Sequence, residues 1–257
     1  MSILRAGGGH RLSRQRLDKT LAHMGIGTRS ELKKIAKQGR IQVNGHIVKD
    51  AGLQIAPEHD RIEVDGEWIQ YKEFIYLMLN KPQGVISATE DGRERTVLDL
   101  LDGTLRIFDL FPVGRLDKDT EGLLLLTNDG QLAHNLLSPR KHVPKTYLAH
   151  VEGAVGEADQ NYFAEGVRLD DGYVTLPAQL VIQHVDEDCS PPLSVIDLTI
   201  HEGKFHQVKR MFQAVDKQVV YLKRIQMGTL LLDPKLALGE YRELSNKELE
   251  GLKGEAT

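Results

Sequence analysis

The positive charge of this chain is concentrated at its N-terminal end, and this division constrains the architecture more than any other feature. Residues 1–49 contain eleven Lys and Arg but only two acids, a net charge of +9, whereas the complete chain carries −4. Such a change of sign indicates a basic module joined to a more acidic body. Basic modules bind polyanions because phosphate contacts release counterions. The charge favours nucleic-acid contact, although a solvated helix face would have the same composition.

The remaining composition excludes several classes of protein. Apolar residues make up 40% and charged residues 27% of the 257 residues, as in soluble globular proteins. The longest apolar run, Phe74–Leu79, has six residues, far fewer than the ~20 of a membrane-spanning helix. The single cysteine, Cys189, excludes disulfides within the chain and multi-cysteine zinc sites. We therefore expect a cytoplasmic protein without membrane contact.

Local patterns predict a small mixed module at the N-terminus. Leu17 and Leu21 have the spacing of a short amphipathic helix. The residues of Thr28–Glu31 form a capping-box pattern that begins a second helix. Asn44-Gly45 and Asp65-Gly66 lie between short alternating segments and predict two hairpin turns. Two short helices and a small sheet are expected.

This order resembles the S4-type RNA-binding module of ribosomal proteins and RNA-modifying enzymes. The matching stretches are Arg16–Lys19, Ser30–Lys37 and Gly39–Gly45. The resemblance implies a small S4-like α/β RNA-binding domain with its linker over residues 16–73. Residues 1–15, with Gly7-Gly8-Gly9, are expected to be a flexible basic arm or an extension that is not native. The side chains expected to contact RNA are Arg16, Lys19, Arg29, Lys33, Lys34, Lys37 and Arg40.

A second domain is expected over residues 74–250, followed by a tail at residues 251–257. Strands, turns and a few helices alternate irregularly, which predicts an α+β domain with a mixed, mostly antiparallel sheet flanked by helices. The turn Lys81–Gly84 separates the apolar strand Phe74–Leu79 from a further predicted strand at Val85–Ala88.

The most informative segment, Gly114–Gly130, combines a polar loop, an apolar strand, a turn and the start of a helix. A carboxylate just before a buried strand, such as Asp117, has the rigid support that a catalytic group needs. A calcium loop is a poor fit because Asn128 stands where the bidentate Glu is required. The residues alone leave open a solvated acidic loop or an active-site aspartate beside Arg115.

The same segment resembles the central motif of the ribosomal small-subunit pseudouridine synthase (RsuA-type) family. The order is Gly-Arg-Leu-Asp followed by Thr-x-Gly-Leu-Leu-Leu-x-Thr-Asn-Asp-Gly. Further family segments match at Leu79–Gly84, Lys145–Leu148, Glu202–Phe212 and Gly239–Arg242. With the N-terminal module, the resemblance spans nearly residues 16–250.

The resemblance implies the isomerisation of uridine to pseudouridine, and roles for individual residues. Asp117 would act at the sugar, as nucleophile or as base. Tyr147 would pack on the target base and take part in proton transfer, although a tyrosine on this strand could be plain core. Lys209 would pair with the catalytic aspartate. Substrate positioning is expected of Arg115, His206 and Arg210, with a structural ion pair or a solvated face as the alternative.

The expected substrate is a uridine in small-subunit (16S) ribosomal RNA, because residues 79–84 and 206–210 resemble that branch most. One alternative is a synthase acting on large-subunit (23S) rRNA, and another is a non-catalytic ribosome-assembly protein. The expected partner is ribosomal RNA, within an assembling small subunit, and a monomer is the default. No Walker loop, dinucleotide fingerprint or metal-ligand spacing occurs, so neither cofactor nor metal is expected.

Overall fold

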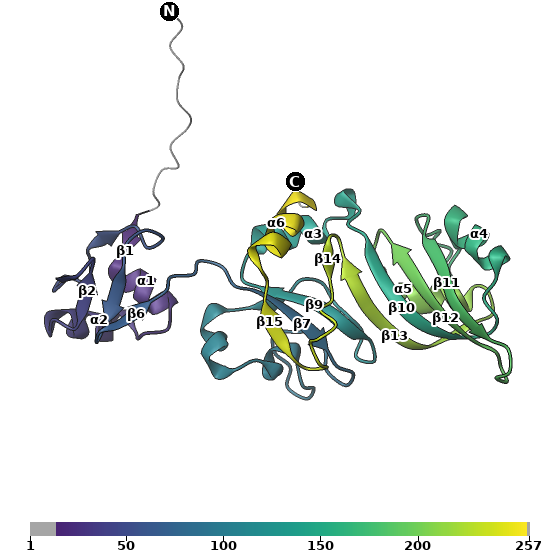
Figure 1. The fold of residues 1–257 in the computed structure, drawn as a ribbon, viewed down its shortest axis with the longest axis horizontal. Coiled ribbons are helices and arrows are strands. Elements are labelled where there is room, and N and C mark those ends of the chain that lie inside the picture. The colour runs from purple at the N-terminus through teal and green to yellow at the C-terminus, as the bar shows by residue number, and fades with distance from the viewer. Residues whose placement is uncertain (1–13, 256–257) are drawn as a thin grey trace, which may run out of the picture. The chain divides into compact units, whose positions relative to one another are not determined.

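The computed structural model describes residues 14–255, which fall into two compact units. The first unit holds the residues up to Glu73 together with Gly103–Phe108, and the second holds the remainder (Figure 1). Most of the basic arm expected at residues 1–15 lies outside the described residues. Within residues 14–255, no helix combines the length and the apolar character needed to cross a membrane.

The first unit has the two helices and the small sheet that the sequence predicts. Strands β3, β2, β5 and β6 form an antiparallel sheet in that order, and β1 pairs with β4. Its core contains the fully buried Leu17, Leu21, Leu32, Ile41 and Ile62. The elements are β1 (Gln15–Arg16), α1 (Leu17–His23), α2 (Arg29–Lys37), β2 (Ile41–Val43), β3 (His46–Ile47), β4 (Gln54–Ile55), β5 (Ile62–Val64), β6 (Glu67–Ile69) and the 3-10 helix η2 (Gly103–Phe108).

Local chemistry in this unit follows the sequence pattern closely. The Glu31 amide donates to the Thr28 hydroxyl at 3.3 Å, and the Thr28 amide donates to the Glu31 carboxylate at 2.7 Å. Both members of Asn44-Gly45 and of Asp65-Gly66 have positive φ, between 52° and 84°. The predicted capping box and both hairpin turns are therefore confirmed.

The second unit is built on a nine-stranded sheet with the order β11-β12-β10-β13-β9-β7-β15, to which β14 and β8 add at β13 and β9. β13 and β9 run parallel, and the other pairs are antiparallel. The predicted mixed, mostly antiparallel sheet is confirmed. The strands are β7 (Tyr76–Lys81), β8 (Phe111–Pro112), β9 (Glu121–Thr127), β10 (Lys145–Glu152), β11 (Gln179–Asp186), β12 (Leu193–Ile200), β13 (Gln218–Met227), β14 (Leu230–Leu231) and β15 (Tyr241–Glu243).

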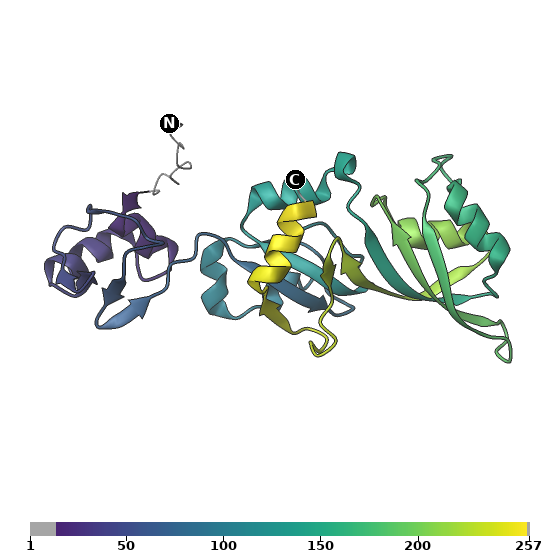
Figure 2. The same ribbon diagram turned by 45° about the horizontal axis from the view of Figure 1, so that its top comes forward.

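Helices pack on this sheet in two groups (Figure 2). Leu132 and Leu136 of α3 and Leu252 of α6 are buried in one cluster with Leu123 and Leu125 of β9. Farther along the sheet, α4 and α5 meet through two phenylalanine rings whose centroids lie 5.0 Å apart. The helices are α3 (Gly130–Leu137), α4 (Glu157–Glu165), α5 (Gln207–Gln213) and α6 (Asn246–Glu255), with the 3-10 helices η1 (Val97–Leu100) and η3 (Pro139–Lys141).

Two sequence expectations differ from this structure. The tail expected from residue 251 is instead helical as far as Glu255, because Leu252 is fully buried in the α3–α6 cluster. The strand expected at Val85–Ala88 is wrong, and only an isolated bridge from Ile86 to Thr96 forms there. The Ser87 hydroxyl donates to the Leu116 carbonyl and accepts from the Leu116 amide, each at 3.0 Å. This segment therefore supports the loop before Asp117 rather than extending the sheet.

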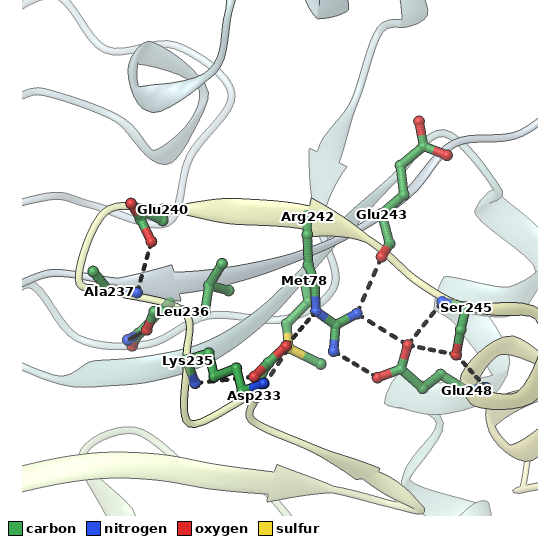
Figure 3. Close-up of polar contacts among 11 residues, drawn as sticks. Met78, Asp233, Lys235, Leu236, Ala237, Glu240, Arg242, Glu243, Ser245 and Glu248 are labelled. Atoms are coloured by element: carbon green, nitrogen blue, oxygen red, sulfur yellow. Dashed lines mark hydrogen bonds and ion pairs between the residues drawn. The ribbon is translucent and has the colours of Figure 1, made fainter.

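An arginine network holds the edge strand β15 next to β7 (Figure 3). The Arg242 guanidinium donates to Asp233 at 2.7 Å and to both carboxylate oxygens of Glu248, at 2.8 and 3.0 Å. The guanidinium lowers the pKa of Glu248 to about 2. The network joins β15, the turn before it and the start of α6, and so it supports β7, which ends at Lys81.

Candidate active site

Asp117 lies in the short loop between β8 and β9, with 32% of its side chain exposed. The Thr120 amide donates to the Asp117 carbonyl at 3.1 Å, so the loop makes a tight turn immediately before β9. Leu123–Leu126 of β9 are completely buried. The carboxylate thus has the rigid support expected from the sequence, while it remains open to a substrate.

Gly122 allows β9 to approach β13 directly after this loop. Its φ is +101°, and an added Cβ would lie 2.3 Å from the backbone oxygen of Arg224 on β13. Only glycine fits this close backbone approach without strain. The parallel β9–β13 pair therefore depends on Gly122, which pairs with Arg224.

Lys81 anchors the Asp117 loop through hydrogen bonds to backbone carbonyls. Its side chain is completely buried, and its ammonium donates to the carbonyls of Pro82 at 3.1 Å, Asp117 at 3.0 Å and Thr120 at 2.9 Å. Burial lowers the pKa of Lys81 to about 8, although nearby carboxylates oppose the shift. Sequence reasoning placed Lys81 in a turn and in a family-like segment but gave it no role at the site. Its signal is a lysine that ends an apolar strand.

Lys209 and His206 both approach the Asp117 carboxylate. The Lys209 ammonium lies 3.5 Å from Asp117 Oδ2, and His206 Nε2 lies 3.6 Å from Asp117 Oδ1. Lys209 belongs to α5, and His206 is the residue that precedes this helix. The structure therefore brings together three residues, from two segments far apart in the chain, that the sequence singled out.

Asp119 is an additional member of this cluster. Both of its carboxylate oxygens accept from the Lys209 ammonium, at 2.6 and 2.8 Å, which is closer than Asp117. This hydrogen bond lowers the pKa of Asp119. Sequence reasoning missed its pairing with Lys209, because the two residues lie 90 positions apart in the chain.

Tyr147 lies on β10 with its side chain on the buried face. Tyr147 is 8% exposed, and the alternate residues Ala149 and Val151 are completely buried. It pairs with Arg224 of β13, which in turn pairs with Gly122 at the start of β9. Tyr147 is thus two strands away from the strand that follows Asp117, and its catalytic role stays a prediction.

Arg210 and Arg115 do not join the Asp117 cluster. The Arg210 guanidinium donates to Asp170 at 2.6 Å and lies 2.7 Å from an Asp171 oxygen, so it ties α5 to a neighbouring turn. The expected positioning role of Arg210 is therefore not supported by its contacts. Arg115 is exposed and has no ion pair within residues 14–255.

The basic residues of the first unit divide into two groups. Arg16 donates twice to Asp18, at 3.0 and 2.8 Å, and Arg40 donates twice to Asp65, at 2.6 and 2.5 Å. These two arginines therefore stabilise the module itself. The others are exposed and, within the described part of the chain, form no ion pair: Lys19, Arg29, Lys33, Lys34 and Lys37.

Comparison with known proteins shows the family to which this chain belongs. The RNA pseudouridylate synthase family model matches residues 75–214, and the S4 domain model matches residues 15–62. The chain belongs to the RNA pseudouridylate synthase family. The resemblance inferred from the sequence is thereby confirmed, together with the S4 domain and the isomerase activity. The match includes Asp117, Tyr147 and Lys209.

Three relatives of this pseudouridine synthase illustrate the family. The uncharacterized RNA pseudouridine synthase YtzG of Bacillus subtilis is 53% identical, with 91% of this chain and 96% of the relative covered. Ribosomal small subunit pseudouridine synthase A of Escherichia coli is 42% identical, with 91% and 98% covered. Ribosomal large subunit pseudouridine synthase B of Bacillus subtilis is 39% identical, with 93% and 96% covered.

Proposed function

We propose that this synthase isomerises one uridine of small-subunit (16S) ribosomal RNA, with Asp117 as the reacting carboxylate. The observation that carries the catalytic assignment is the half-exposed Asp117 carboxylate flanked by Lys209 and His206 at 3.5 and 3.6 Å. The substrate assignment is supported by the 42% identity to a small-subunit synthase, against 39% for a large-subunit synthase.

The reaction is an isomerisation that needs one carboxylate close to the sugar. The bond between C1′ and N1 breaks, the uracil rotates and C5 bonds to C1′. The C5 proton then leaves to solvent, and N1 takes up a proton. Asp117 serves this exchange either as a nucleophile at C1′ or as a base at the sugar. The Lys209 ammonium, 3.5 Å from Asp117 Oδ2, would hold the carboxylate in position at the sugar.

Tyr147 and the basic residues of the first unit complete the proposed mechanism. The uridine must leave its stack to reach Asp117, at a cost of a few kcal/mol. The Tyr147 ring would pack on the extruded base, and its hydroxyl would take part in proton transfer. Phosphate contacts with the exposed lysines of α2 would supply binding energy that offsets extrusion. The proposed setting is an assembling small subunit in the cytoplasm, with the enzyme as a monomer.

Chemical mapping of pseudouridine on both rRNAs, from cells with and without the gene, tests this proposal. One pseudouridine should disappear from 16S rRNA and none from 23S rRNA, and the parental gene should restore it. Loss of a 23S site instead would reject the substrate assignment in favour of a large-subunit synthase. An unchanged pattern in both rRNAs would favour a ribosome-assembly role without catalysis.

A further inference from the structure

Phe205 presents a large apolar ring to solvent beside the active site. It is 75% exposed, the highest value among the large hydrophobic side chains that the structure describes. Burial of this ring therefore contributes little to the stability of the fold, and stability does not explain an aromatic residue at this position. A single exposed apolar residue is common on protein surfaces. The surroundings of Phe205 must therefore show whether the residue has a functional role.

The ring of Phe205 is stacked on the ring of His206. The two centroids are 3.7 Å apart, and the planes are inclined by 20°. His206 has φ 48° and ψ 34°, the left-handed region that non-glycine residues rarely adopt. This unusual backbone conformation sets the stacked pair at the point where the chain turns into α5.

The turn that carries the pair is held by its own hydrogen bonds. The Lys204 amide donates to the Gln207 side-chain oxygen at 2.9 Å, and the Gln207 amide group donates to Glu202 at 2.9 Å. The Lys204 ammonium also lies 4.5 Å from the centre of the Tyr173 ring. The backbone on both sides of Phe205 is therefore positioned rather than free.

The stacked pair leads directly to the reacting carboxylate. His206 Nε2 lies 3.6 Å from Asp117 Oδ1, and the Phe205 ring is stacked on the ring of His206. Among the described residues, His206 is the only ring in contact with Phe205. Because Phe205 is 75% exposed, its opposite face remains available for a further ring.

The substrate of this family supplies such a ring. When a target uridine is extruded, the base next to it loses a stacking partner on one side. Aromatic side chains replace this contact, and the stacking tolerates different bases because each has a π-face. The exposed ammonium of Lys204, the residue before Phe205, would bind an accompanying phosphate.

We propose that Phe205 is a stacking platform for the RNA base next to the target uridine. The stack of this base, Phe205 and His206 would set the extruded nucleotide at Asp117. The inference rests on the proposed role of Asp117, but it does not depend on which rRNA carries the target.

The first test measures kcat/KM on whichever rRNA the parent enzyme modifies. Phe205→Leu keeps an apolar side chain but removes the ring, and it should lower kcat/KM by about 5- to 150-fold, the range for one stacked base. Phe205→Tyr keeps the ring and should stay within about threefold of the parent. The matched control is Phe74→Leu. It removes a 40% exposed ring that lies just before the first residue of β7, whereas Lys81 is the last residue of that strand.

The second test separates stacking on the RNA from support of the protein. A short rRNA fragment that carries the mapped uridine is made with an abasic residue on its 5′ side or on its 3′ side. At one of these positions, loss of the base should abolish the difference between the parent and Phe205→Leu. The proposal is overturned if Phe205→Leu is within twofold of the parent on intact RNA. It is also overturned if the variant loses the same factor on both abasic RNAs. If Asp117→Asn remained active, the catalytic assignment would fail. The comparison of the parent with Phe205→Leu would still test the stacking proposal independently.

Discussion

Replacing Lys81 with methionine should alter how the stability of the second unit depends on pH. The Lys81 ammonium is completely buried, and burial lowers its pKa from 10.5 to about 8. The folded protein therefore releases this proton at a lower pH than the unfolded chain. Below pH 8 the buried charge costs stability in full, and this cost is relieved as the pH rises from about 8 to 10.5.

The magnitude follows from the two pKa values, because each pKa unit corresponds to ~1.4 kcal/mol. Between pH 7 and pH 10 the free energy of unfolding of the parent should therefore rise by ~2 kcal/mol relative to that of Lys81→Met, after allowance for solvent screening. At pH 7 the variant avoids the buried charge, but it leaves the carbonyls of Pro82, Asp117 and Thr120 without their shared donor. We therefore expect kcat to fall at pH 7 because the Asp117 loop loses its anchor.

The assay is urea unfolding at several pH values, followed by far-ultraviolet circular dichroism. Tryptophan fluorescence is unsuitable because the single tryptophan, Trp68, belongs to the first unit. The control is Lys118→Met, which removes an exposed ammonium from the same loop. Its free energy of unfolding should differ from that of the parent by less than ~0.5 kcal/mol, and this difference should not change with pH. A difference between the parent and Lys81→Met that stays flat from pH 7 to pH 10 would refute the reasoning.

Three further changes probe neighbouring parts of the structure. Asp119→Asn removes the closest partner of the Lys209 ammonium and should slow single-turnover isomerisation by about three- to tenfold, whereas an unchanged rate would exclude a positioning role. Gly122→Ala should lower the free energy of unfolding by ~2 kcal/mol or more, because its φ is +101° and its Cβ would meet backbone; urea titration giving less than ~0.5 kcal/mol would contradict this. Changing all three α2 lysines to glutamine should lower the slope of log affinity against log salt by up to ~2.7 in an RNA-binding titration, and an unchanged slope would show that α2 does not contact phosphate.

Short-range features of this fold could be predicted from the sequence. Asn44-Gly45 and Asp65-Gly66 form the expected turns because few residue pairs tolerate positive φ at both positions. The capping box of Thr28 and Glu31 formed because both partners lie within four residues. Asp117 was a candidate because the apolar strand directly after it marks a rigid support, but only the family resemblance favoured it over a solvated acidic loop.

The connections around the site could not be predicted in the same way, because they join residues far apart in sequence. Lys81 contacts a carbonyl 36 residues away, Lys209 reaches Asp119 across 90 residues, and Arg210 pairs with Asp170 across 40. Each cation had several possible partners, and the strand order of the sheet decided among them. The expected roles of Lys209 and Arg210 diverged for this reason, although the two residues are adjacent in the chain.

The most direct test of the account is single-turnover tritium release from C5-labelled uridine in rRNA with Asp117→Asn. This change keeps the shape of the side chain but removes its charge and its basic oxygen. RNA binding should change little, while isomerisation should fall by at least ~10⁴-fold, equivalent to ~5.4 kcal/mol of barrier. Asp119→Asn, two residues away, is the matched control and should release tritium much faster. If Asp117→Asn turned over within tenfold of the parent, Asp117 would not be the reacting carboxylate.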